Sequence, residues 1–217
     1  MYPEKLKELI LAGESSTVEF KRKFTSSEKI AKEVAAFANT IGGYLIFGVD
    51  DDGKIIGVES EKSEIDLIET ACEFFVNPPV EHEIYIVSLN GKDVVVVRVK
   101  NSDNKPHKVI INHDEKKSEL KAYIRVGEES VVASKEMTKV LATQNRNSEP
   151  VKLAIGEKEK ALFIYLEKHG KATIKDFSDL VNISKRRATQ LTVRLVKAGV
   201  LQIHNSSESD YFTLLGK

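Results

Sequence analysis

The chain has 217 residues, and its 33 basic and 33 acidic side chains cancel to zero formal charge. A composition of 41% hydrophobic and 30% charged residues predicts a soluble globular protein of one large or two small domains. Zero net charge excludes a uniformly basic nucleic-acid coat, and the single cysteine, Cys72, excludes an intramolecular disulfide framework. A single cysteine fits a reducing cytoplasm, where we expect the protein, and no apolar run is long enough to span a bilayer, so no membrane role is expected.

The first two thirds of the chain mix helical and strand patterns, which predicts an α+β fold. Asn90-Gly91 is the strongest short-range hairpin signal. Cys72 lies on the apolar face of a predicted helix, so we expect it in the core and not at a reactive site. Helices are expected near 6–12, from Ser27 to the stop at Gly42-Gly43, over 63–76 and from Ser134 to about 142. Strands are expected at 17–21, 44–50, 54–58, 84–89, 94–99 and 122–126.

A polar stretch, Gln144–Pro150, is the best candidate for a linker because it lacks periodicity and ends in proline. It predicts two domains, residues 1–146 and 147–217. Residues 148–217 carry 12 basic and 8 acidic side chains, whereas residues 1–147 carry 21 and 25. The neutral total therefore conceals a basic second unit and an acidic first unit.

The second unit has the sequence plan of a small winged helix-turn-helix domain. Three predicted helices, over 157–169, 173–181 and 184–198, are followed by strands at 200–204 and 211–215. The turn between these strands contains no Lys or Arg, which weakens the case for a wing that contacts phosphate.

The third helix of this unit is basic at its start, where a recognition helix enters the major groove. Arginine holds guanine edges or phosphates, and Gln190 suits adenine. The alternative is a solvated face in a winged helix that only dimerises. The predicted nucleic-acid contacts here are Lys185, Arg186, Arg187, Gln190 and Arg194.

Several short motifs follow one another along the first unit. Glu14-Ser-Ser-Thr-Val-Glu19-Phe-Lys21 is followed by Ala36-Phe-Ala-Asn-Thr40, Gly42-Gly43 and Gly48-Val-Asp-Asp-Asp-Gly53, and later by Pro106-His107 and Tyr123-Ile-Arg-Val-Gly127. Over roughly residues 4–143 this series resembles the Schlafen-type AlbA-like domain. In prokaryotic regulators that domain often precedes a winged helix.

The resemblance implies nucleic-acid binding by a mixed-sheet domain. In the animal Schlafen nucleases two glutamates and an aspartate form a metal-dependent site that cuts structured RNA. The matching positions are Glu14, Glu19 and Asp51, with Asp50 and Asp52 as close competitors. Carboxylates suit Mg²⁺ or Mn²⁺, and such an ion would activate a water beside a phosphodiester. Lys21 and Lys23 would neutralise phosphate nearby.

Ordinary structural roles compete with each of these assignments. Glu14 suits a surface position, Glu19 suits a pair with a neighbouring lysine, and Asp51-Asp52-Gly53 is common turn chemistry. Arg125 either contacts phosphate or pairs with an acidic residue, and His107 is expected at the surface of a polar loop. The animal enzymes use two such domains, which a homodimer of this chain would supply.

Three functions follow from these features. The leading prediction is a nucleic-acid-binding protein, a transcriptional regulator whose winged helix engages DNA and whose first domain binds DNA or RNA, a ligand or a partner. The alternative is a metal-dependent endoribonuclease acting on tRNA or rRNA. The third is an interaction or antitoxin-like module in which the winged helix only dimerises.

Overall fold

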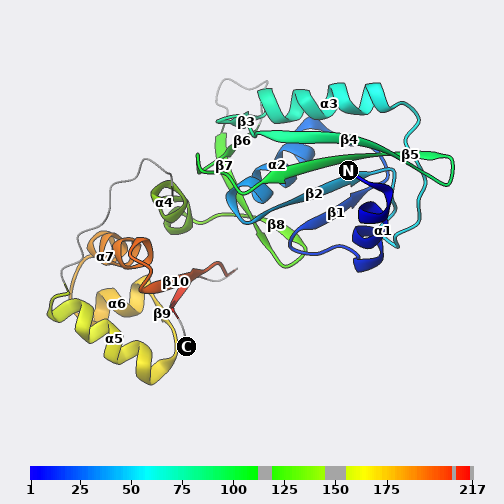
Figure 1. Ribbon diagram of the computed structural model, residues 1–217. Coiled ribbons are helices and arrows are strands. Elements are labelled where there is room, and N and C mark those ends of the chain that lie inside the picture. Colours follow the sequence, from blue (N-terminus) through cyan, green and yellow to red (C-terminus); the bar gives the residue numbers. More distant parts are fainter. Residues whose placement is uncertain (112–118, 145–154, 207–208, 216–217) are drawn as a thin grey trace. The chain divides into compact units, whose positions relative to one another are not determined.

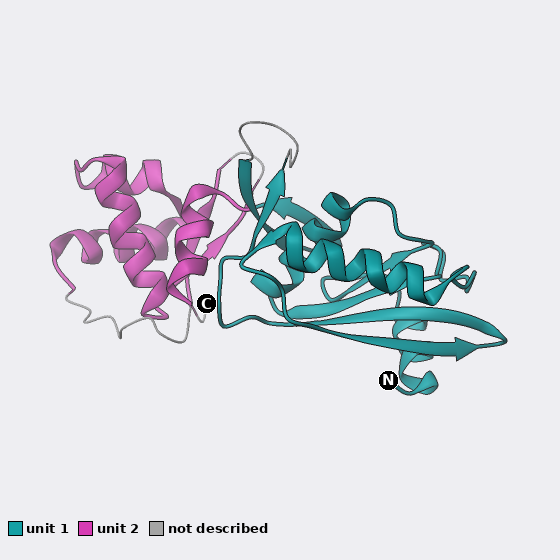
Figure 2. Cartoon of the chain, turned by 90° about the horizontal axis from the view of Figure 1, so that it is seen from above, with its two compact units in different colours: residues 1–132 teal, residues 133–217 magenta. Residues whose placement is uncertain are grey.

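The computed structural model describes residues 1–111, 119–144, 155–206 and 209–215 (Figure 1). Contacts within the chain separate two compact units, Met1–Val132 and Ala133–Lys217 (Figure 2). Helices and mixed sheets occur together, so the predicted α+β class is confirmed. Every helix in these residues is too short or too polar to cross a bilayer.

The first unit contains two sheets with helix α2 between them. One sheet has the strand order β1-β2-β5-β4, and the other has the order β3-β6-β7-β8. The elements, within the described residues, are α1 (Pro3–Ala12), β1 (Val18–Lys21), α2 (Ser27–Asn39), β2 (Gly42–Phe47), α3 (Glu61–Phe74), β3 (Val76–Asn77), β4 (His82–Leu89), β5 (Lys92–Lys100), β6 (Lys108–Ile111), β7 (Glu119–Val126) and β8 (Glu129–Val132).

Helix α2 forms the centre of this unit because its small side chains admit close neighbours on several sides. The helix contributes fully buried residues from Ile30 to Ala38, and strands of both sheets pack on it. Ser26 caps its start by accepting a hydrogen bond from the backbone of Lys29. Helix α1 instead packs on the opposite face of the β1-β2-β5-β4 sheet, where Leu6 is fully buried.

The predicted hairpin around Asn90-Gly91 is confirmed. Strands β4 and β5 pair antiparallel across it, and both turn residues have the positive φ that such a turn requires. Cys72 is fully buried in the core, and burial raises the pKa of its thiol to about 12. The thiol is therefore a packing group, as its place on the apolar stripe predicts.

Two local predictions around β2 were wrong. The expected strand at 54–58 is a loop, because Gly48 turns the chain with φ +92° and only Val49 bridges to Ile55. The Gly42-Gly43 pair does not lie beyond helix α2 as a stop but begins β2, which pairs parallel with β1 and antiparallel with β5. Gly42 has a φ of +79°, which favours glycine, but a Cβ at either position would also lie closer than 3 Å to neighbouring atoms, so close tertiary packing adds to the requirement for glycine.

The second unit packs three helices and a small antiparallel sheet around one core, with α4 alongside. The sheet has the strand order β10-β11-β9, and Phe177, Leu195 and Phe212 lie fully or almost fully buried at its centre. The elements, in the described part, are α4 (Lys135–Thr143), α5 (Glu157–His169), β9 (Ala172–Thr173), α6 (Ile174–Leu180), α7 (Lys185–Lys197), β10 (Leu201–His204) and β11 (Tyr211–Leu214).

Helix α4 groups with the second unit, whereas the sequence assigned it to the first. It packs against α7, and Val140 and Leu141 are buried. Its N-cap, Ser134, also donates a hydrogen bond to Asp210. The predicted linker falls almost wholly on residues 145–154, which lie outside the described residues.

Candidate functional site

A buried arginine joins three segments of the first unit. Arg125, on β7, has a side chain with no exposed surface. Its Nη1 lies 3.0 Å from Oε2 of Glu19 on β1 and 2.9 Å from Oε2 of Glu33 on α2. Its Nη2 donates to the carbonyl of Ser15 at 2.7 Å, and the guanidinium lies 4.8 Å from the ring centre of Phe37. One cation thus holds β1, α2 and β7 together.

The two carboxylates around Arg125 have further partners. Ser130 donates to Oε2 of Glu33 at 2.6 Å, and Lys21 pairs with Glu19. Burial raises the pKa of Glu33, while Ser130 and Arg125 act in the opposite direction. Two cations face two carboxylates here, so the group is balanced in formal charge. We call Glu19, Lys21, Glu33, Arg125 and Ser130 the arginine cluster.

The structure brings together only part of the predicted catalytic set. Glu19 lies in the arginine cluster, whereas Oε1 of Glu14 accepts a hydrogen bond from the backbone of Phe20 at 2.8 Å. Asp51 is exposed in its turn, and its neighbour Asp50 pairs with Arg22 at 3.3 Å. Among the described residues no three His, Cys, Asp or Glu side chains form a group able to hold a metal ion. The carboxylates implied by the resemblance therefore do not fit Mg²⁺ or Mn²⁺ in this arrangement.

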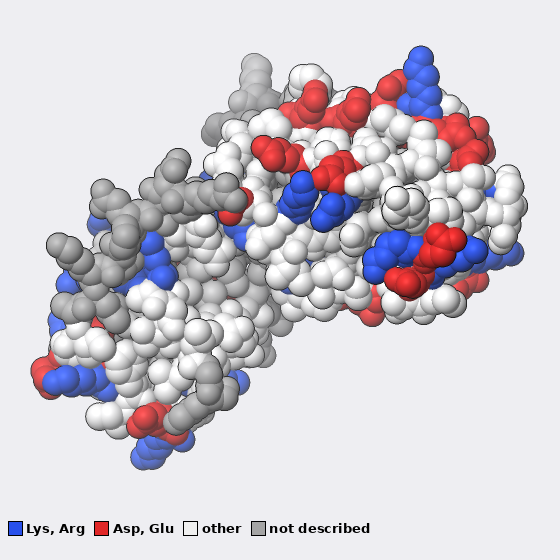
Figure 3. All heavy atoms as spheres, in the orientation of Figure 1, with Lys and Arg blue, Asp and Glu red and all other residues white. Residues whose placement is uncertain are grey.

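The residues of the first unit that were predicted to contact phosphate lie in different surroundings. Lys21 and Arg125 belong to the arginine cluster, so Arg125 pairs with acidic neighbours, the second of its two alternatives. Lys23 is exposed. Lys100 and the half-buried Arg98 both pair with Glu83, and hydrogen bonds from Lys100, the Tyr85 hydroxyl and Arg98 lower the pKa of Glu83 to about 2. Acidic side chains gather along α3 (Figure 3), in keeping with the acidic balance of this unit.

Sequence reasoning missed Glu33 and Ser130. A signal for Glu33 was present, because it lies on the same helical face as Ile30 and Phe37, three and four positions away. A charged residue on an apolar face requires a partner. No comparable local signal marks Ser130.

His107 is buried, although the sequence predicted a surface position. Its side chain lies between the carbonyl oxygen of Pro78, 2.8 Å from Nδ1, and the hydroxyl of Ser102, 2.7 Å from Nε2. Asn39 of α2 bonds both the N–H and the C=O of His107 through its side-chain amide, at 2.8 Å each. The Asn39 and Pro106-His107 motifs therefore form one structural joint between α2 and the loop before β6.

Acid should destabilise the protein through His107. Burial lowers the pKa of this histidine, so below about pH 6.5 the unfolded chain binds a proton that the folded chain resists. Its contribution to stability is present above pH 6.5 and is lost as the pH falls towards the folded pKa. Urea denaturation between about pH 5 and pH 8 should show a shallower pH dependence for His107→Asn than for wild type. Equal slopes would contradict this role, and His169→Asn, at an exposed histidine, is the matched control.

The predicted contact residues of α7 all lie at the surface. Lys185, Arg186, Arg187, Gln190 and Arg194 are exposed, and Ser184 caps the helix by accepting a hydrogen bond from the backbone of Arg187. The first turn contains no acidic residue, whereas every other described helix has at least one there. Like charges at the positive end of a helix dipole are unfavourable without an anion.

The cations in the first turn of α7 differ in their partners from the three arginines of the first unit. Arg22, Arg98 and Arg125 each form an ion pair with a carboxylate. By contrast, Lys185, Arg186 and Arg187 make none with any residue that the structure describes. The first turn of α7 therefore presents uncompensated positive charge.

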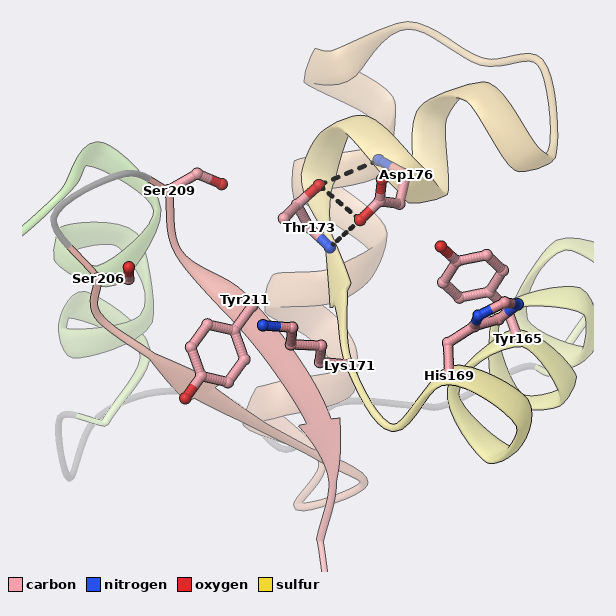
Figure 4. A pocket seen from close by; sticks show the side chains of 8 residues that line it. All are labelled: Tyr165, His169, Lys171, Thr173, Asp176, Ser206, Ser209 and Tyr211. Carbon is pink, nitrogen blue, oxygen red and sulfur yellow. Dashed lines mark hydrogen bonds between the residues drawn. The ribbon is translucent and has the colours of Figure 1, made fainter.

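A separate pocket of about 370 Å³ lies between α5, β9 and the β10–β11 region (Figure 4). Tyr165 and His169 stack on one side, and the Nζ of Lys171 lies 5.3 Å from the ring centre of Tyr211 on the other. Asp176 is bonded to the backbone and hydroxyl of Thr173, so its carboxylate serves as a helix cap. Thr173 and Asp176 therefore have structural roles in this pocket.

Comparison with known proteins finds one matching family and two solved structures with some similarity to this chain. A sequence model of the family described as Schlafen, AlbA_2 matches residues 14–134. A protein of Corynebacterium diphtheriae aligns with 92% of the chain at 17% identity and a TM-score of 0.47, and the chain spans 34% of that protein. The N-terminal domain of a RecG-related protein of Nitrosomonas europaea aligns with 71% of the chain at 21% identity and a TM-score of 0.43, with 94% of that domain covered.

Proposed function

The chain belongs to the Schlafen, AlbA_2 family, which points to nucleic-acid binding, and we propose that it is a DNA-binding transcriptional regulator. In this proposal the second unit is a winged helix, and α7 is its recognition helix. The uncompensated positive charge in the first turn of α7 is the observation that carries the proposal.

The architecture of the second unit supports this role. Its order after α4 is helix, short strand, helix, helix and two strands, and β9 joins the edge of β11 to complete a three-stranded sheet. Core side chains such as Leu191 and Leu195 bury one face of α7. Arg186, Gln190 and Arg194 lie on the part of the helix that is exposed to solvent. The major groove admits a single helix of this kind.

An endoribonuclease is not proposed. Glu19 is paired with Arg125 and Lys21, and Glu14 is bonded to the backbone of β1. These contacts give both carboxylates structural roles in the first unit.

Removing the α7 arginines should sharply weaken DNA binding. Each neutralised phosphate contributes about 0.9 to the slope of log K against log salt, so Arg186→Ala, Arg187→Ala and Arg194→Ala together should lower the slope by about 2.7. At about 0.1 M salt this corresponds to a roughly 500-fold loss of affinity. Fluorescence anisotropy with labelled duplex DNA over a salt series measures both quantities.

The matched control removes three exposed lysines from α5 of the same unit: Lys158→Ala, Lys160→Ala and Lys168→Ala. It has the same change in net charge but leaves α7 intact. Equal losses in both triple variants would indicate diffuse electrostatic attraction and would refute α7 as the docking helix. Binding unchanged from wild type in the arginine variant would refute the proposed function itself.

A further inference from the structure

A groove of about 580 Å³ runs between α4 and α7 within the second unit. Helix α4 lies beside α7 (Figure 1), and its side of the groove is formed by Lys139, Ala142 and Thr143. The residues that line it from α7 are Arg186, Arg187, Thr189, Gln190, Leu191, Val193 and Arg194.

Helix α4 is held in place by contacts at both its start and its middle. Ser134 accepts a hydrogen bond from the backbone of Met137 at 2.9 Å and donates one to Asp210. Val140 and Leu141 are 1% and 3% exposed, and Thr189 of α7 is 4% exposed. These buried side chains make α4 a fixed wall of the groove.

The charged side chains that the structure describes in the groove are all basic. Lys139, Arg186, Arg187 and Arg194 line it, together with two threonines and one glutamine, and none of the described residues that line it is acidic. Lys139 is exposed and makes no ion pair with any described residue. A groove lined by four cations complements a polyanion such as the phosphate backbone of a duplex.

We propose that α4 is part of the nucleic-acid interface, with Lys139 binding a backbone phosphate of the duplex that α7 reads. This proposal rests on the proposed function. Arg186, Arg187, Gln190 and Arg194 remain exposed with α4 in place, so α4 flanks the docking face of α7 and leaves that face open. Lysine acts at such a site as a point charge, so Lys139 positions the duplex and leaves base reading to α7.

The experiment compares Lys139→Ala with Lys158→Ala in the full chain. Lys158 is an exposed lysine of α5 in the same unit and lies outside the groove. Loss of one phosphate contact should lower the salt slope by about 0.9 and the affinity about eight-fold at about 0.1 M salt. The loss should be equal for duplexes of different sequence, because the contact is to the backbone. Lys158→Ala should match wild type, and thermal melting verifies that both variants are folded.

Comparing Lys139→Ala with Arg186→Ala distinguishes a failure of this inference from a failure of the proposed function. If Lys139→Ala binds like wild type while Arg186→Ala binds weakly, α4 is outside the interface and the inference is overturned, but the proposed function stands. Tighter binding by Lys139→Ala would also overturn it, because α4 would then obstruct α7. If Arg186→Ala and Lys139→Ala both bind like wild type, the proposed function fails as well.

Discussion

Arg125→Met is expected to destabilise the first unit by about 3–5 kcal/mol, because removing one partner of a buried ion pair leaves the other charge uncompensated. Here two carboxylates lose their common partner at once, and only Glu19 keeps a second cation, Lys21. The side chains of Glu19 and Glu33 are 12% and 18% exposed, so water compensates them poorly. Urea denaturation, with the free energy of unfolding extrapolated to water, measures the loss.

Two further variants distinguish the stability cost of removing buried Arg125 from the cost of removing a charge at the surface. Arg98→Met removes an arginine whose side chain is 43% exposed and paired with Glu83, and it should cost far less, because water screens such a pair. Adding Glu19→Gln and Glu33→Gln to Arg125→Met removes the stranded charges and should restore part of the stability. A cost for Arg125→Met no larger than that for Arg98→Met would contradict the role assigned to the arginine cluster.

Gly43→Ala should cost roughly 1–3 kcal/mol or more, because it overfills a packed core. A Cβ at this position would lie 2.4 Å and 2.5 Å from two ring carbons of Phe37 and 2.7 Å from the carbonyl oxygen of Thr17. Neither neighbour can yield freely, since Phe37 is fully buried and the Thr17 carbonyl accepts the Tyr44 N–H at 2.8 Å. The shift in the urea midpoint reports the cost.

Phe37→Leu provides the internal test of this explanation. A smaller side chain at position 37 makes room for the new methyl group, so the double variant should be more stable than the sum of the two single changes implies. Gly156→Ala is the control, because only the flexible carboxylate of Glu159 approaches that position, at 3.1 Å. Strict additivity of Gly43→Ala and Phe37→Leu would contradict the steric account.

The sequence predicts the parts of the fold that depend on near neighbours. The Asn90-Gly91 turn supplies the positive φ values of its hairpin, and the apolar stripe of α3 places Cys72 in the core. The basic face of α7 follows from helical periodicity once the cap at Ser184 is recognised. Each of these features is decided within a few residues of chain.

The remaining features depend on residues that are distant in sequence. Arg125 meets Glu33 across 92 positions, so the sequence left its two alternatives open until the packing of β7 on α2 was known. His107 is buried because Asn39, 68 positions away, binds its backbone. Gly43 is required by Phe37 and not by the end of a helix. The secondary-structure propensity of a short segment does not depend on such distant contacts, so it cannot predict them.

The first turn of α7 contains cations but no acidic residue, and this lowers the folding stability of the unbound second unit. Arg186 and its neighbours repel one another and the helix dipole, so the free second unit is less stable than the same fold with an ordinary first turn. A bound polyanion reverses the sign of this interaction and relieves it. If α7 binds DNA as proposed, the protein gives up part of its folding stability, and the relief of this repulsion favours the bound state, which is the usual trade between stability and function at a binding surface.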